Sequence, residues 1–211
     1  MALKLESVRI ALGKLVLVPP LDIAVAPGER VTVMGPSGCG KSTLLAYIAG
    51  TMDCAFTATG RVTIDDEDVT ALAPEKRKVG ILFQDDLLFP HLSVGHNLAF
   101  ALPPASRSRP DRREAVARAL AEANLAGFED RDPATLSGGQ RARVTLMRTL
   151  LAEPRVLLLD EPFNKLDARL RQDFRRFVFE HAAKRGLPIL LVTHDAAEAQ
   201  AVGGQIVVLG A

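Results

Sequence analysis

Apolar and polar residues alternate through the first part of the chain, in the runs LKLESVRIAL (residues 3–12) and LDIAVAPGERVTVMG (residues 21–35). A period of two, with turn residues between the runs, predicts short strands that form a hairpin and lead into a buried strand. From Lys41 the run KSTLLAYIAG changes to helical spacing, and Gly50 is the expected C-cap. The beginning of the chain is therefore predicted to fold as strand, loop and helix.

Near-continuous apolar runs occupy two later places, VLLLD at residues 156–160 and ILLVT at residues 189–193. Strands this apolar are usually buried on both faces, as in a parallel sheet that is covered by helices. Residues 60–64 and 79–83 also predict strands, and the run QIVVLG at residues 205–210 predicts a closing one. This arrangement predicts an α/β fold.

The composition changes after Gln84, where a Pro- and Ser-rich loop precedes an amphipathic helix that is predicted over residues 112–125. We predict a single domain with a core of residues 1–84 and 145–211 and an inserted helical subdomain of residues 85–144. The apolar face of the predicted helix consists of Ala115, Val116, Ala119, Leu120 and Ala123, with the pair Glu114 and Arg118 on the other face.

Composition narrows the class of protein. With 48% hydrophobic and 24% charged residues, a chain of 211 residues can bury a substantial core. The net charge of +1 gives no electrostatic reason to expect nucleic acid as a partner. No apolar run approaches the roughly 20 residues of a membrane-spanning helix, and we expect no secretion signal. The two cysteines cannot form a disulfide framework, so a reducing cytoplasm is the expected compartment.

The segment GPSGCGKST matches the phosphate-loop pattern G-x-x-x-x-G-K-[ST] and lies between a predicted strand and a predicted helix. Glycines let backbone N–H groups turn toward phosphate oxygens, and the helix N-terminus adds positive potential. Lys41 is expected to reach the β- and γ-phosphates, and the Ser42 hydroxyl to bind Mg²⁺. The alternative, a glycine-rich turn that contains Lys-Ser by chance, leaves this context unexplained. The expected nucleotide-binding residues here are Gly35, Pro36, Ser37, Gly38, Cys39, Gly40, Lys41, Ser42 and Thr43.

Two acidic residues, Asp160 and Glu161, end one buried strand, at the edge where open α/β sheets bind ligands. Asp160 can hold Mg²⁺ through water, and Glu161 can orient or deprotonate an attacking water. Acidic residues are also common at the ends of strands. The pair therefore indicates a catalytic site only in combination with the phosphate loop. His194 and Gln84 follow other predicted strands, where each can serve catalysis or be a structural polar residue.

A second glycine pair lies in the segment TLSGGQRARVTLMR, residues 135–148. Ser137 fits a helix N-cap with Gln140 at the capping-box position, which would aim backbone amides and the helix dipole at an anion. The alternative is that SGGQ merely starts a helix, since this capping pattern is common.

In this order, the segments GPSGCGKST, ILFQ, LSGGQRARV, VLLLDEP, NKLD and LLVTHD resemble the motifs of ABC transporter ATP-binding subunits over nearly the whole chain. The resemblance implies a P-loop NTPase core of the RecA-like type with an N-terminal antiparallel β subdomain. It also implies an ATPase that binds ATP and Mg²⁺. Position by position, it assigns Lys41 and Ser42 to Walker A, Gln84 to the Q-loop that contacts metal and water, Ser137, Gly138, Gly139 and Gln140 to the signature motif, Asp160 to Walker B, Glu161 to the catalytic carboxylate, Asp167 to the D-loop and His194 to the H-loop.

The resemblance also explains the second glycine pair. In this family two subunits pack head to tail, so that the signature motif of one closes over the γ-phosphate held by the phosphate loop of the other. Two positions depart from the family pattern. Leu12 stands where an aromatic residue usually stacks on adenine, which predicts weaker or less selective adenine binding, and Asn164 begins the D-loop where Ser is more usual.

The sequence DDLLFPHLSVGHNL after Gln84 resembles that of bacterial importer subunits, in which this surface receives a short helix of the membrane protein. Leu87, Leu88 and Phe89 fit either an exposed apolar patch or the core of the helical subdomain. The resemblance is greatest to short subunits of the thiamine, iron, spermidine and molybdate importers, and we expect no C-terminal regulatory domain. It implies a second ATPase subunit, transmembrane permease subunits and an extracytoplasmic solute-binding protein as partners, at the cytoplasmic face of the inner membrane.

Two other functions are alternatives to a transport ATPase. A non-transport ABC ATPase that acts on nucleic acid or the ribosome is the first alternative, but only about fifty residues separate Gln84 from Leu136, too few for a long coiled coil. A phosphate-loop kinase is the second, and it would leave the LSGGQ and NKLD segments without a purpose.

Overall fold

The computed structural model describes residues 1–103 and 108–210, which form two compact units. The first unit consists of residues 1–81, 155–161 and 180–211, and the second of residues 82–154 and 162–179. Among the described residues, no helix combines the length and the apolarity needed to cross a bilayer.

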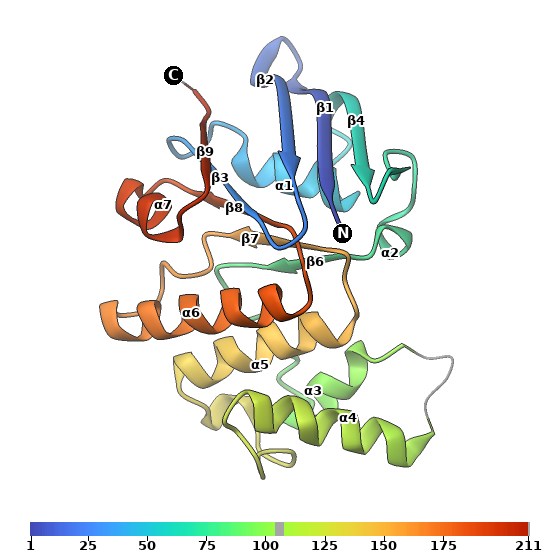
Figure 1. Cartoon of the computed structure of the whole chain (residues 1–211), viewed down its shortest axis with the longest axis vertical. Helices are drawn as coiled ribbons and strands as arrows, with labels where there is room; N and C mark the ends of the chain where they lie inside the picture. Colours follow the sequence, from blue (N-terminus) through green and yellow to red (C-terminus); the bar gives the residue numbers. More distant parts are fainter. Residues whose placement is uncertain (104–107, 211) are drawn as a thin grey trace. The chain divides into compact units, whose positions relative to one another are not determined.

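An antiparallel sheet in the first unit contains the predicted N-terminal hairpin (Figure 1). The strand order is β2-β1-β4-β5, and the β1–β2 turn places Gly13 at a φ of 57°, where a side chain would add strain. The strands are β1 (Leu3–Leu12), β2 (Leu15–Val25), β4 (Phe56–Ile64) and β5 (Glu67–Asp68). The hairpin prediction is confirmed.

A second sheet in the same unit has the order β6-β7-β8-β3-β9. The pairs β3–β8, β7–β8 and β3–β9 are all parallel. Every residue of β8 is buried, and so is all of β7 except its last residue, which confirms the prediction from their apolar runs. β9 forms an edge and is mostly exposed. The strands are β3 (Arg30–Met34), β6 (Val79–Leu82), β7 (Val156–Asp160), β8 (Ile189–Thr193) and β9 (Gln205–Val208).

Helix α1 (Lys41–Ala49) belongs to the core that joins the two sheets, because Leu44, Leu45 and Ile48 cluster with buried residues of both. It ends at the predicted C-cap, since Gly50 has a φ of 80° and its N–H bonds the last turn. The first unit also contains α2 (Pro74–Arg77) and α7 (Ala196–Val202).

The second unit is helical, and α3, α4 and α5 contact one another. Its elements are α3 (Val94–Ala101), α4 (Arg109–Glu122), a 3-10 helix η1 (Pro133–Thr135), α5 (Gly138–Leu151) and most of α6 (Ala168–Lys184), whose last residues belong to the first unit. These limits differ from those of the predicted subdomain, residues 85–144, because the whole of α5 and residues 162–179 join the second unit. The subdomain assignment itself stays a prediction.

Helix α4 corrects the predicted helix of residues 112–125 at both ends. Ser108 accepts a bond from the Asp111 N–H and the Asp111 carboxylate accepts one from the Ser108 N–H, so this capping box starts the helix three residues earlier. The predicted apolar face is buried, and Glu114 and Arg118 form an exposed ion pair. Part of the loop expected before this helix, residues 104–107, lies outside the described residues.

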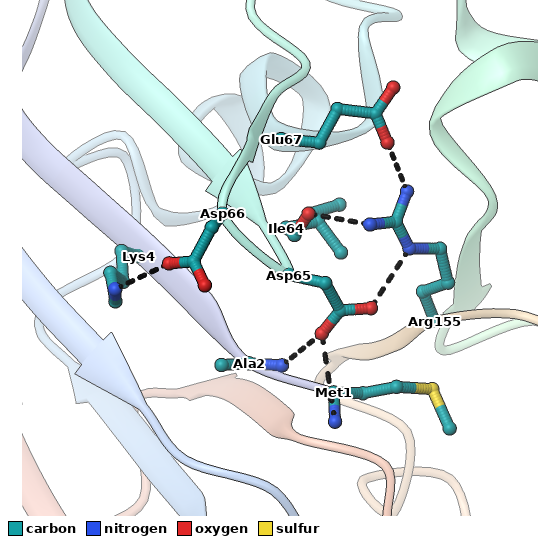
Figure 2. A network of polar contacts seen from close by, with 8 residues as sticks. All are labelled: Met1, Ala2, Lys4, Ile64, Asp65, Asp66, Glu67 and Arg155. Carbon is teal, nitrogen blue, oxygen red and sulfur yellow. Dashed lines mark hydrogen bonds and ion pairs between the residues drawn. The ribbon is translucent and has the colours of Figure 1, made fainter.

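A polar network ties the start of β7 to the β4–β5 turn (Figure 2). The Arg155 guanidinium donates to the Asp65 carboxylate (3.1 Å), the Glu67 carboxylate (2.6 Å) and the Ile64 carbonyl (2.6 Å). The other Asp65 oxygen accepts from the Ala2 N–H at 2.6 Å. Burial raises the pKa of the Asp65 carboxyl, but the Ala2 amide and the Arg155 guanidinium outweigh it and hold this pKa below its usual value.

Replacing Arg155 with Ala should lower the free energy of unfolding by about 1 to 2 kcal/mol, because the Ile64 carbonyl and two carboxylates lose their donor. Urea denaturation measures the change. The control is Arg61→Ala, because the Arg61 side chain is 60% exposed in its pairs with Glu6 and Asp68 and should contribute less than about 0.5 kcal/mol. An equal decrease in the free energy of unfolding in the two variants would contradict a stabilising role of the Arg155 network.

Candidate nucleotide-binding site

The phosphate-loop segment connects β3 to α1 and requires glycine at defined points. A Cβ at Gly35 would lie 2.6 Å from the Leu209 carbonyl oxygen and 2.8 Å from the Cys39 Sγ, so only glycine fits. Gly38 and Gly40 have φ values of 83° and 95°, a region that other residues rarely adopt. This backbone can curve around a phosphate group with its N–H groups turned inward.

Lys41 lies inside this curve and is buried. Its ammonium donates to the carbonyls of Gly35 and Pro36, at 2.8 Å each. An ammonium has three N–H donors, so the loop satisfies two of them and a phosphate oxygen can accept from the remaining one. The two bonds hold the positive charge in the loop.

Ser42 and Asp160 meet although they are far apart in the sequence. The Ser42 hydroxyl donates to the Asp160 carboxylate at 3.1 Å. Burial raises the pKa of the Asp160 carboxyl, and the neighbouring Glu161 charge raises it further, while the Ser42 hydroxyl and the Lys41 ammonium lower it. The net pKa is above the usual value, chiefly because burial disfavours the charged form. A hydroxyl and a carboxylate are oxygen ligands of the kind that Mg²⁺ prefers, so this pair fits that ion.

Glu161 and His194 form the second contact of this cluster. The imidazole Nδ1 lies 2.9 Å from the Glu161 Oε1, within hydrogen-bond distance. Glu161 has a φ of 47°, in the left-handed region where a non-glycine residue is strained by about 1 to 3 kcal/mol. Strain of this kind is concentrated at functional sites, and it persists here directly after a fully packed strand.

Strand register explains why these residues gather. Asp160 is level with Val192 in the β7–β8 pair, and Met34 is level with Thr193 in the β3–β8 pair. The carboxyl ends of parallel strands meet at one edge of a sheet, which is where open α/β sheets bind ligands. The predicted residues of the first unit therefore lie together: the segment from Gly35 to Thr43, Asp160, Glu161 and His194.

The other predicted residues belong to the second unit. Ser137 and Gln140 form the predicted capping box at the start of α5: the Gln140 N–H donates to the Ser137 hydroxyl (3.3 Å) and the Ser137 N–H to the Gln140 side chain (2.9 Å). Gly138 and Gly139 occupy the first turn. Asp167 accepts from the N–H groups of the first residues of α6, at 3.1 and 3.0 Å. Gln84 is exposed, just after β6.

Sequence reasoning missed three residues that shape the site. The Thr193 carbonyl accepts a hydrogen bond from the Gly35 N–H (3.3 Å). The Leu209 carbonyl occupies the space that a side chain at Gly35 would need. Asp195 caps α7 by accepting from the Ala197 N–H at 2.8 Å, which fixes the chain directly after His194. An Asp before a helical run is a capping signal, so Asp195 could have been found. No sequence pattern predicts the two carbonyl contacts.

The structure also gives the exposure of the apolar residues Leu12 and Leu87–Phe89, for which the sequence made predictions. Leu12 is 43% exposed at the end of β1, where it pairs with Leu15, which is 61% exposed. Leu87 is 57% exposed, whereas Leu88 and Phe89 are half-buried, so the three residues divide between the two alternatives of surface patch and core.

Comparison with known proteins defines the class. A family model described as ABC transporter matches residues 18–164. The chain is 46% identical over 190 residues to the uncharacterized ABC transporter ATP-binding protein YnjD of Escherichia coli K12, covering 90% of this chain and 87% of that protein. It is 42% identical over 207 residues to the Fe(3+) ions import ATP-binding protein FbpC of Pasteurella multocida, covering 98% of this chain and 58% of the relative. It is 40% identical over 207 residues to the spermidine/putrescine import ATP-binding protein PotA of Bacillus cereus ATCC 14579, covering 98% and 62%.

The chain therefore belongs to the ABC transporter family. Within that family it is an ATP-binding subunit, an ATPase that powers transport. The resemblance, the P-loop α/β fold and the ATPase activity predicted from the sequence are confirmed, and the nucleic-acid alternative receives no support. The chain spans only about three fifths of the iron and polyamine relatives, 58% and 62% of their lengths.

Replacing Leu12 with Tyr should lower the dissociation constant for ATP about three- to tenfold, because an aromatic ring adds a stacking surface for the base. Titration with a fluorescent ATP analogue, in competition with ATP and with GTP, measures the affinity and the base selectivity. Ile206→Tyr is the matched control, because Ile206 is another exposed aliphatic strand residue of the first unit (40%). Unchanged ATP affinity in the Leu12→Tyr variant would rule out a base contact at this position.

Proposed function

We propose that this chain is the ATPase subunit of a bacterial solute importer and that two copies close on ATP and Mg²⁺ during each cycle. The observation that carries the catalytic part is the pair of contacts at one sheet edge, Ser42 with Asp160 and Glu161 with His194. The importer part is supported by the relatives that are named as iron and spermidine/putrescine import proteins.

The phosphates of ATP are proposed to bind in the segment from Gly35 to Thr43, with Lys41 at the β- and γ-phosphates. Ser42, Asp160 and Gln84 would hold Mg²⁺, which neutralises charge on the phosphate oxygens. Their oxygen atoms suit this hard cation, which supports the proposal.

Glu161 is proposed to orient and deprotonate the attacking water. A base needs one oxygen directed at the water, and the His194 contact restrains the carboxylate through its other oxygen. His194 would then lie next to the reacting atoms, where an imidazole N–H would stabilise charge on the γ-phosphate. Glu161 lies directly after β7, and its N–H donates to the Val192 carbonyl of β8 at 3.2 Å, which fixes its backbone at the sheet edge.

The segment from Ser137 to Gln140 is proposed to bind the γ-phosphate of a nucleotide held by the second subunit. Its capping box leaves the first turn of α5 with amides and a positive dipole end, which favour an anion. Asp167 would contact the second subunit at the same interface. Each site then takes residues from both copies, so a monomer should hydrolyse ATP poorly.

Membrane partners complete the proposal. The relatives' names support transmembrane permease subunits, which would place this chain peripherally at the cytoplasmic face of the inner membrane. An extracytoplasmic solute-binding protein is the further proposed partner. ATP-driven closure would shift the permease between its conformations through differential binding.

Copurification from detergent-solubilised membranes tests the partners. A permease with several membrane spans should copurify with this chain, and the solute bound to its extracytoplasmic protein should be identifiable by mass spectrometry. ATP-dependent uptake of that solute into reconstituted vesicles would establish import. Movement of the solute in the opposite direction, or hydrolysis stimulated by nucleic acid, would contradict the proposal.

Replacing Glu161 with Gln should leave ATP bound, stabilise the dimer and reduce kcat at least a hundredfold, because the amide cannot accept the water proton. Size-exclusion chromatography with ATP and Mg²⁺ measures the dimer, and phosphate release measures turnover. Glu75→Gln is the control, since Glu75 is exposed in the first turn of α2 and away from the sheet edge. Turnover retained by the Glu161→Gln variant would place the base elsewhere.

A further inference from the structure

Residues 85–87, which follow Gln84 in the second unit, are held by polar contacts rather than by packing. Leu87 is 57% exposed and the preceding Phe83 is 46% exposed, whereas Leu88 and Phe89 further along are half-buried. A cavity of about 280 Å³ adjoins this segment, lined by residues that include Gln84, Asp86 and Gly138. Leu87 has a φ of 46°, which is a strained conformation for leucine. A strained and poorly packed segment keeps its shape only if other bonds restrain it.

Helix α5 provides the first set of restraints. The Arg141 Nε donates to the Asp86 carboxylate at 3.0 Å, and the Thr145 hydroxyl donates to the Asp86 carbonyl at 2.9 Å. The Arg148 guanidinium donates to the Leu87 carbonyl at 2.9 Å. Arg141, Thr145 and Arg148 are spaced i, i+4 and i+7 on one face of the helix. This face therefore holds both the carboxylate of Asp86 and the backbone around the strained Leu87.

Arg141 also connects this contact to the segment from Ser137 to Gln140. Its guanidinium donates to the Leu136 carbonyl at 2.7 Å, directly before the capping box. Asp86 and the capping box are therefore linked through a single side chain. The Arg141 and Asp86 side chains are only 38% and 31% exposed, which strengthens their ion pair relative to one in open solvent.

Asp85 provides a second restraint, toward the turn that precedes α6. Its carboxylate forms an ion pair with the Lys165 ammonium. Lys165 lies in the turn Asn164–Asp167, whose Asp167 carboxylate caps α6. Neighbouring acids thus bind two different cations, one on α5 and one in this turn. The three segments that carry Gln84, Ser137–Gln140 and Asp167 are joined through Asp85 and Asp86.

We propose that Asp85 and Asp86 are positioning residues for ATP hydrolysis, which fix the segment after Gln84 to the start of α5 and to the turn before Asp167. The three segments then move as one body within the second unit, so that a displacement of any one of them displaces the other two. The inference rests on the proposed roles of Gln84, Ser137–Gln140 and Asp167. Neither acid touches the nucleotide in this scheme.

Charge reversal at the exposed pair tests the proposal in the full-length chain with ATP and Mg²⁺. Lys165→Asp and Asp85→Lys should each lower kcat about three- to tenfold, with the KM for ATP changed less than twofold, because Lys41 and Ser42 are unaltered. The exchange of both charges, D85K with K165D, should restore at least half of the wild-type kcat. Lys165→Ala should lower kcat about two- to fivefold relative to the wild type at low salt. In 0.5 M KCl the difference in kcat should be less than twofold, because an exposed ion pair is weak and is screened by salt.

The control is the exposed Glu114–Arg118 pair on α4, in the same unit. E114R with R118E should leave both kcat and KM unchanged. Unfolding midpoints of all variants show that the losses in kcat do not follow global stability. If the single reversals leave kcat unchanged, or if the double exchange loses as much as the two single changes combined, the positioning role is wrong.

A parallel Gln84→Ala variant separates this inference from the proposed function. Loss of turnover in Gln84→Ala without any effect of the charge reversals would overturn the positioning role alone. Unchanged turnover in Gln84→Ala would overturn the role of Gln84 and with it the inference. The milder Asp86→Asn change, which keeps an acceptor for Arg141, should lower kcat less than Asp86→Ala does. Equal kcat in these two variants would contradict positioning through the Arg141 bond.

Discussion

The candidate nucleotide site depends first on the parallel register of β3, β8 and β7. Backbone ladders set Met34 level with Thr193 and Asp160 level with Val192, so three strands end together. A slip of one residue would reverse which face every side chain of a strand occupies, so the side chains packed against both faces of β7 and β8 would have to rearrange. The apolar runs thus bring the phosphate loop, the carboxylates and the imidazole to one edge of the sheet.

This placement has an electrostatic cost. Asp160 is half-buried, and its carboxyl has a raised pKa chiefly because burial disfavours the charge. An acid with a higher pKa in the folded state binds its proton more tightly there, so the folded state loses stability as the pH rises from the unfolded value of 3.8 through the folded value. Folding therefore disfavours the charged form of this carboxyl.

The sequence predicted those parts of the site that local rules control. Glycine spacing, the periodicity of two, the Ser137–Gln140 capping box and the Gly50 C-cap each depend on neighbours within a few residues, and each is present. The start of α4 was misplaced because Ser108 and Asp111 begin the helix before its apolar stripe. Contacts such as Leu209 with Gly35, or Arg155 with Asp65, depend on tertiary packing between distant segments, and no periodicity encodes them.

The two units hold their functional segments by different forces. In the first unit the phosphate loop, Asp160 and Glu161 continue directly from buried strands, so their positions share the stability of the core. In the second unit, side-chain hydrogen bonds and partly exposed ion pairs hold the segments around Gln84, Ser137 and Asp167. Such contacts open at lower free energy than core packing and weaken with salt. The phosphate loop is therefore held more firmly in its unit than the segments around Gln84, Ser137 and Asp167 are held in theirs.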